Sequence, residues 1–166
     1  MYDLRKLRLE VGDEHREPIT VRVDPFTVGH ESYVPTAEQL PAELRITRLR
    51  SGLLFRLRFG VTLTGPCHRC LGDAEISLSI DSEEYQDHHP EPGAEDDMTC
   101  EYLADEELDT DRWASDATVL AMPPKVLCGE DCLGLCAECG HNLNEGPCGH
   151  GERVEDPRWG ELKRLL

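Results

Sequence analysis

A stretch of strictly alternating apolar residues constrains the fold of this chain more than any other feature. From residue 53 to residue 63 every second position carries a large apolar side chain: Leu53, Phe55, Leu57, Phe59, Val61 and Leu63. Most of the residues between them are polar or small. A period of two puts these side chains on one face of an extended strand and the others on the opposite face. We therefore predict a half-buried antiparallel strand here.

The neighbouring segments continue this pattern. Leu44 and Ile46 precede the strand across a tight turn at Ser51–Gly52, and residues 76–80 alternate again after a loop. Together these segments predict a three-stranded antiparallel meander, and residues 19–23 predict a further strand. The expected fold is therefore an α+β fold, built on an antiparallel β-sheet that is meander-like or barrel-like, with one or two short helices.

Two short helices are expected. The first is capped by Asp109–Thr110 and stopped by Pro123–Pro124, and its apolar side carries Trp113, Ala117, Leu120 and Ala121. The second begins with Asp156 as N-cap and Pro157 in the first helical position. Its apolar face comprises Trp159, Leu162, Leu165 and Leu166. This helix is too short to be stable alone, so we expect it to dock on this chain or on a partner.

Charge is distributed very unevenly. The chain has 34 acidic and 17 basic residues, a net charge of −17, yet thirteen of the acids lie between Glu83 and Asp111, where there is no Lys or Arg. Low hydrophobicity and self-repulsion predict that residues 83–111 form a disordered acidic insertion. Two roles stay open for it: a solvated linker, or a surface for a basic partner. Cys100, within this stretch, is interpreted as a spare thiol.

The segment from Leu44 to Gly72 has the opposite character, with six arginines and no acid. Arg56 and Arg58 fall on the outward face of the predicted meander. They are either surface arginines whose aliphatic stems are partly buried, or a patch that faces nucleic-acid phosphates. The net charge of the whole chain argues against nucleic-acid binding by bulk electrostatics, but this segment keeps a local contact open.

The cysteines follow the spacing of metal ligands. Seven of the eight, with one histidine, form closely spaced groups: Cys67 with Cys70, Cys128 with Cys132, Cys136 with Cys139, and Cys148 with His150. No run of about 18 apolar residues occurs, and the charged N-terminus does not resemble a signal peptide. We therefore expect a cytoplasmic location, where such cysteines bind metal more often than they form disulfides.

Eight ligands suffice for two closed tetrahedral zinc sites, both structural. The preferred partition gives site A (Cys67, Cys70, Cys128 and Cys132) and site B (Cys136, Cys139, Cys148 and His150). Site A would pin the tail to the sheet, and site B would fold the tail itself. The competing partition is one zinc ion held by residues 128–148, with Cys67 and Cys70 free. The chain is expected to divide into two parts. Residues 1–125 form the β-rich domain, with the acidic insertion at residues 83–111, and residues 126–166 form a zinc-knuckle tail with its short C-terminal helix.

These motifs resemble the YceD family, the large ribosomal RNA subunit accumulation proteins. Cys67-His68-Arg69-Cys70-Leu71 is similar to the family's CxRCL element, and residues 128–144 to its ending DCxGLCxxCGxNLN. Asp156-Pro157-Arg158-Trp159 resembles its closing DPR(W/L) motif. His150 stands where a last cysteine is common, and residues 11–42 match nothing distinctive.

The resemblance implies a non-enzymatic ribosome-biogenesis factor that supports accumulation of large-subunit (23S) ribosomal RNA. The residues allow two partners, the ribosomal RNA precursor or a basic ribosomal protein of the large subunit, and no membrane or small-molecule substrate. A generic zinc-ribbon interaction module and a thiol oxidoreductase using Cys67 and Cys70 are the alternatives. The phosphate-loop, GxSxG and HExxH motifs of common enzyme classes are missing from the sequence.

Overall fold

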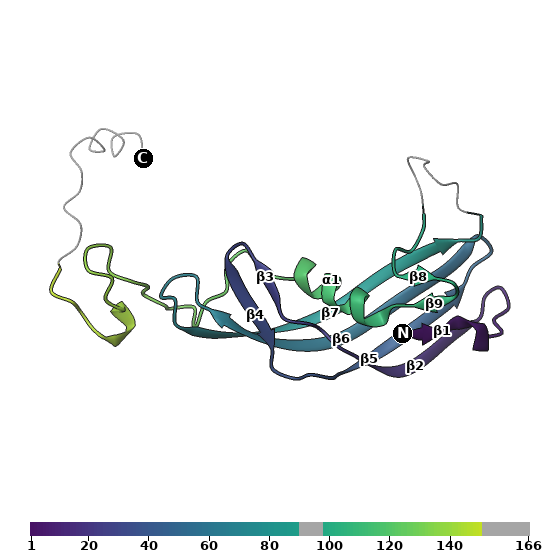
Figure 1. The fold of residues 1–166 in the computed structure, drawn as a ribbon, viewed down its shortest axis with the longest axis horizontal. Coiled ribbons are helices and arrows are strands. Elements are labelled where there is room, and N and C mark those ends of the chain that lie inside the picture. Colours follow the sequence, from purple (N-terminus) through teal and green to yellow (C-terminus); the bar gives the residue numbers. More distant parts are fainter. Residues whose placement is uncertain (90–97, 151–166) are drawn as a thin grey trace, which may run out of the picture.

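The computed structural model describes residues 1–89 and 98–150 (Figure 1). Its main sheet is antiparallel and has six strands: β2 (Glu14–Val21), β3 (Phe26–Val28), β4 (Glu31–Pro35), β5 (Leu40–Arg48), β6 (Gly52–Pro66) and β7 (Asp73–Asp87). The central strand β6 pairs along its whole length with β7, while β5 and β4 share its other edge. The predicted α+β class and the β5–β6–β7 meander are confirmed. Within the described residues β2 and β7 do not pair, so the sheet is open and not a closed barrel.

The alternating residues of β6 form the centre of the core. Phe55, Leu57 and Leu63 are completely buried, and the residues of the opposite parity face solvent or are half-buried. The residues of β5 on the same face of the sheet are buried too, and Leu44 and Ile46 are 0% exposed. Because the register of the meander aligns these parities, the apolar side chains of the strands share one face of the sheet.

One α-helix, α1 (Thr110–Leu120), covers this apolar face. It begins as predicted, with the Asp109 side chain accepting the N–H of Arg112. Trp113 is buried beneath it, and its indole N–H donates to the Ser82 hydroxyl of β7 at 2.9 Å. The prediction was wrong at the other end of the helix. Leu120 is 85% exposed, because it is the last helical residue and lies at the margin of the buried stripe.

A second, small sheet lies at one end of the molecule. It has three strands, β1 (Tyr2–Asp3), β8 (Leu103–Ala104) and β9 (Glu107–Leu108), and a 3-10 turn, η1 (Leu4–Lys6), follows β1. Sequence patterns did not reveal these elements, since strands of two residues carry no periodicity. In Figure 1 this sheet and the N-terminus lie at the opposite end from the cysteine-rich tail.

The expectation of a disordered insertion over residues 83–111 is wrong for much of that segment. Residues 83–87 belong to β7 and pair with β6, and Cys100 and Leu108 are buried in the main core. The physical reason is that apolar residues among the acids, such as Tyr102 and Leu108, bury their side chains while the carboxylates stay at the surface. The rest of the expected insertion, residues 90–97, lies outside the described residues, as does the expected helix over residues 156–166.

In the part of the chain that the structure describes, α1 is far too short and too polar to cross a bilayer.

Candidate metal centres

The β6–β7 hairpin ends in a tight knuckle that carries the first two cysteines. The N–H of Cys67 donates to the carbonyl of Gly72 at 2.7 Å, and the N–H of Leu71 donates back to Cys67 at 2.9 Å. Leu71 closes the turn in the left-handed region, with φ of 57°. This backbone path buries the side chains of both Cys67 and Cys70 on the inner side of the turn.

The tail returns to this knuckle after α1. Val126 is buried against it, and its carbonyl accepts the N–H of His68 at 2.8 Å. Arg69 donates from its guanidinium to the carbonyl of Cys132 at 2.9 Å. Gly134 has φ of +77°, and a Cβ there would approach the Arg69 carbonyl to 3.2 Å, so glycine suits both the conformation and the close approach.

Site A forms where the knuckle and the tail meet. The four sulfur atoms of Cys67, Cys70, Cys128 and Cys132 all lie within 4.8 Å of one another. The Sγ atoms of Cys67 and Cys132 are 3.7 Å apart, and those of Cys70 and Cys128 are 3.6 Å apart. Four thiolates around one zinc ion, each at about 2.3 Å, would be about 3.8 Å apart. The donor set and its spacing therefore fit a tetrahedral zinc ion.

Hydrogen bonds favour the thiolate, the form that binds metal, at two of the four site A cysteines, Cys67 and Cys132, whereas contacts with the neighbouring cysteine side chains raise the pKa of Cys128 to about 12. Burial opposes ionisation of Cys67, but backbone N–H groups of Cys70, Cys128 and Arg69 outweigh it and lower its pKa to about 6. The side-chain amide of Asn144 donates to the Cys132 sulfur at 3.4 Å and lowers the pKa of that thiol. Such donors also orient the ligands.

Site B is built from a second knuckle. The N–H of Cys136 donates to the carbonyl of His141 at 2.8 Å, and Gly140, with φ of +73°, donates back to Cys136 at 2.9 Å. The ligand atoms of Cys136, Cys139, Cys148 and His150 lie within 4.8 Å of one another. His150 Nδ1 is 3.4 Å from the Cys148 sulfur. The N–H groups of Cys139 and Glu138 are the main cause that lowers the pKa of Cys136 to about 6.

Asn144 couples the two sites. It belongs to the 3-10 turn η2 (Leu143–Glu145), between the site B ligands Cys139 and Cys148. From there its Nδ2 reaches the Cys132 sulfur of site A, while its Oδ1 accepts the N–H of Leu133 at 2.8 Å. No spacing pattern in the sequence marks this residue, although it lies in the NLN segment that resembles the family motif.

The eight predicted ligands are thus brought together in the two expected groups of four. In this grouping Cys67 and Cys70 lie against the tail cysteines, unlike in the one-zinc partition. Cys100 belongs to neither group: it is buried in the main core, and this burial raises its pKa. Metal binding by the eight residues stays a prediction, and so does the identity of the metal.

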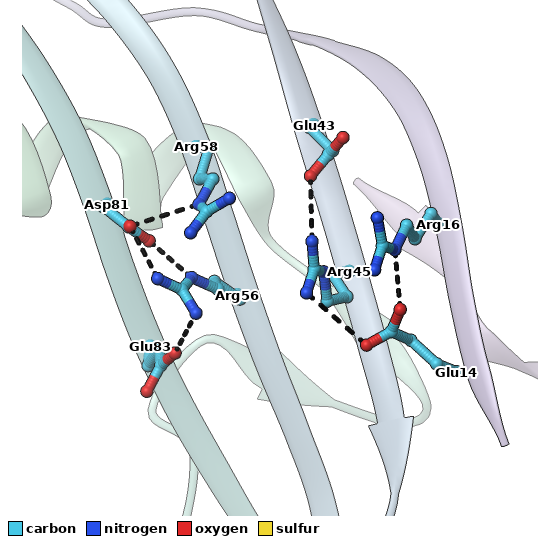
Figure 2. Close-up of polar contacts among 8 residues, drawn as sticks. All are labelled: Glu14, Arg16, Glu43, Arg45, Arg56, Arg58, Asp81 and Glu83. Atoms are coloured by element: carbon cyan, nitrogen blue, oxygen red, sulfur yellow. Dashed lines mark hydrogen bonds and ion pairs between the residues drawn. The ribbon is translucent and has the colours of Figure 1, made fainter.

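The outward face of the sheet carries the arginines singled out by the sequence, and carboxylates from adjacent strands pair with them (Figure 2). Arg56 makes a two-pronged contact with Asp81 at 2.6 and 2.7 Å and also reaches Glu83 at 3.0 Å, while Arg58 contacts Asp81 at 3.1 Å. The hydrogen bonds from Arg56 and Arg58 hold the pKa of Asp81 well below its usual range.

The same pairing continues across β5 and β2. Arg45 lies between Glu43 and Glu14, and Arg16 contacts Glu14 at 2.6 Å (Figure 2). These acids lie in other strands or outside the arginine-rich segment, so the sequence pattern did not connect them with the arginines. On this face the arginines are therefore paired with carboxylates and do not form a free phosphate-binding patch.

Comparison with known proteins agrees with the resemblance seen in the sequence. The family model described as large ribosomal RNA subunit accumulation protein YceD matches residues 55–166, more than half of the chain. Uncharacterized proteins of Mycobacterium tuberculosis and Mycobacterium bovis are 31% identical over 130 residues, and one of Mycobacterium leprae is 37% identical over 65 residues.

The first two alignments cover 76% of this chain and 62% of each relative, and the third covers 39% of this chain and 30% of the relative. The chain therefore spans less than two thirds of the length of these relatives. No solved structure matches it. The match to the family model, which includes both cysteine groups and the β6–β7 hairpin, shows that this chain belongs to the YceD family of large ribosomal RNA subunit accumulation proteins.

Proposed function

We propose that this chain supports the accumulation of large-subunit (23S) ribosomal RNA by binding a basic ribosomal protein of the large subunit in the cytoplasm. Family membership supports the process. The observation that selects a protein partner over RNA is the pairing of the outward-facing arginines with carboxylates.

Zinc has a structural role in this proposal. Sites A and B each offer four protein ligands, which complete the tetrahedral coordination of zinc and leave no position for a reactive water molecule. Both sites hold together segments that have little apolar core of their own. The chain therefore acts as a binding protein without catalysis.

RNA would meet an unfavourable surface on the sheet. A phosphate that approached Arg56 would have to displace Asp81, which already accepts two charge-assisted hydrogen bonds from it. The four arginines and four carboxylates drawn in Figure 2 balance in charge, so this face offers the RNA backbone no net attraction. Counterion release, the main driving force of non-specific RNA binding, needs unpaired positive charge.

A basic protein would meet an excess of negative charge at α1 and the segment that leads into it, although Arg5 and Arg112 pair with four of the acids there. Residues 98–116 carry seven acids and one arginine. Glu101 and Asp105 are exposed there, on backbone that the buried side chains of Cys100 and Leu108 hold in place. Charge complementarity of this kind accelerates association and selects basic partners.

Co-sedimentation with large-subunit precursors on sucrose gradients tests the proposal. The double variant Glu101→Lys/Asp105→Lys is expected to lose co-sedimentation. Glu38→Lys/Glu75→Lys, which makes the same change in net charge at exposed positions elsewhere, is expected to keep it. Arg56→Gln/Arg58→Gln is expected to keep it as well. Loss in the arginine variant together with retention in Glu101→Lys/Asp105→Lys would refute protein binding and support contact with the RNA precursor.

The oxidoreductase alternative makes a separate prediction. Cys67 and Cys70 are 0% and 7% exposed, and two further cysteines adjoin them. If site A holds zinc, these thiols resist alkylation until a chelator is added. Rapid alkylation of Cys67 in the metal-loaded protein would favour a redox role instead.

A further inference from the structure

A cavity of about 290 Å³ opens at the end of the sheet far from the cysteines. It lies between the N-terminal segment, the first residues of β6 and the small β1–β9–β8 sheet. The metal sites do not include it, but two of its lining residues, Leu103 and Glu106, belong to the acidic segment of residues 98–116. Its volume is at the lower end of the range for small-molecule sites, which is about 300–1,000 Å³.

Six of the nine residues that line this cavity are apolar, and the other three are charged. Leu4 and Ile46 in its lining belong to the buried core of the protein, and Leu53 and Leu103 pack against that core while remaining half-buried. The cavity therefore reaches the hydrophobic core from outside. An apolar group placed there would lose its contact with water and gain contacts with these side chains.

Two arginines, Arg8 and Arg48, line the same cavity. Among the described residues neither has a carboxylate within 4.0 Å, whereas Arg16, Arg45, Arg56 and Arg58 on the outward face all do. Arg48 is half-buried and Arg8 is exposed. The one acid in the lining, Glu106, is 3.8 Å from Arg5. The cavity thus combines apolar walls with excess positive charge.

We propose that this cavity binds a small amphipathic anion. Its apolar part would lie against the half-buried side chains of Leu7, Leu53 and Leu103, and its carboxylate or phosphate head would pair with Arg8 and Arg48. Guanidinium groups bind both kinds of head through paired hydrogen bonds. The limited volume restricts the ligand to one short chain or one ring system. None of the ligands of sites A and B lines the cavity, so this binding activity does not depend directly on zinc.

Calorimetric titration of the full zinc-loaded chain tests the proposal with four probes that share one tail. Octanoate and octyl phosphate represent the two kinds of head, octan-1-ol has no charge, and octylammonium has the opposite charge. We expect one binding site per chain. At least one of the two anions should bind there with an affinity tenfold or more above that of octan-1-ol, and octylammonium should bind most weakly. The anion that binds more tightly identifies the head. Failure of both anions to bind, or equal binding of octan-1-ol, would overturn the proposal.

Variants locate the site. Arg8→Gln/Arg48→Gln is expected to weaken binding of the anion at least tenfold, while Arg50→Gln, at an exposed arginine outside the lining, is expected to leave it unchanged. Arg8→Gln alone changes an exposed side chain, so it keeps the fold and should show a several-fold loss. Retention of affinity in both Arg8→Gln and the double variant, or equal loss in Arg50→Gln, would refute the assignment to this cavity.

Discussion

The sharpest prediction concerns the attachment of the tail to the β6–β7 hairpin. Replacing Cys132 by Ser removes one ligand of site A, whereas replacing Cys139 by Ser removes one ligand of site B and leaves site A complete. We expect the first change to detach residues 127–134 from the hairpin and the second to leave them in place. In both variants the sheet should stay folded, because the main core contains no site A residue.

The free energy that zinc must contribute to this attachment follows from the contacts at the tip of the β6–β7 hairpin. Two hydrogen bonds to carbonyl oxygens join the tail to it, from His68 to Val126 and from Arg69 to Cys132, each worth about 1 kcal/mol. Burial of Val126 adds about 2 kcal/mol. Ordering the eight residues 127–134 costs about 12 kcal/mol at about 1.5 kcal/mol per residue. The contacts alone are therefore too weak by about 8 kcal/mol, a difference that a structural zinc ion, at about 10 kcal/mol or more, offsets.

Hydrogen exchange followed by mass spectrometry measures this directly. In the unmodified chain, amides of residues 127–134 should be protected. In Cys132→Ser they should exchange as in an unstructured peptide, while those of β6 keep their protection. Plasma emission spectrometry should give about two zinc ions per chain for the unmodified protein and about one for each variant. Unchanged protection in Cys132→Ser after loss of one zinc ion would refute the reasoning, because weak contacts would then suffice.

Three further predictions concern single side chains. Asn144→Ala removes the amide donor to the Cys132 sulfur and should weaken zinc binding at site A about 10- to 100-fold, measured by competition with a chromophoric chelator; unchanged affinity would contradict the coupling of the two sites. Phe55→Ala leaves a cavity in the core and should lower the free energy of unfolding by about 3–5 kcal/mol in urea titrations, and a loss below 1 kcal/mol would contradict its place there. The lowered pKa of Asp81 stabilises the fold fully above the usual carboxylate range, and this contribution is lost progressively as the pH falls from that range down to the lowered pKa; Asp81→Asn should therefore flatten the acid branch of the stability profile, and an identical profile would show that its pairing with Arg56 and Arg58 contributes nothing.

Local patterns in the sequence predicted the scaffold well. The alternation from Leu53 to Leu63 gives β6 and its buried face, since a period of two depends only on neighbouring residues. The Asp109 cap likewise marks the start of α1. The spacing of the cysteines predicted both groups of four ligands, because the tight turn of a knuckle brings closely spaced cysteines together.

Contacts between residues that are far apart in the sequence could not be predicted from such local patterns. Arg56 and Asp81 are 25 residues apart, and their contact depends on the register of β6 against β7. Taken separately, the arginine-rich segment therefore left a phosphate-facing patch open and the acidic segment predicted a disordered loop, where the structure has a neutralised face and a partly buried segment. The burial of Cys100 could not be predicted for a similar reason. The many acids around it indicated exposure, whereas the apolar residues of the same segment pack into the core.

The sequence by itself thus determined the β5–β6–β7 meander, part of β2, the start of the helix, the candidate ligands and the family. Only the tertiary structure decided which charges face one another, that Asn144 joins the two cysteine groups, and that Arg8 and Arg48 line one apolar cavity. The physical reason is the range of the interactions: periodicity, capping and ligand spacing act within a few residues, whereas ion pairs and cavities form between segments that only the folded sheet brings together.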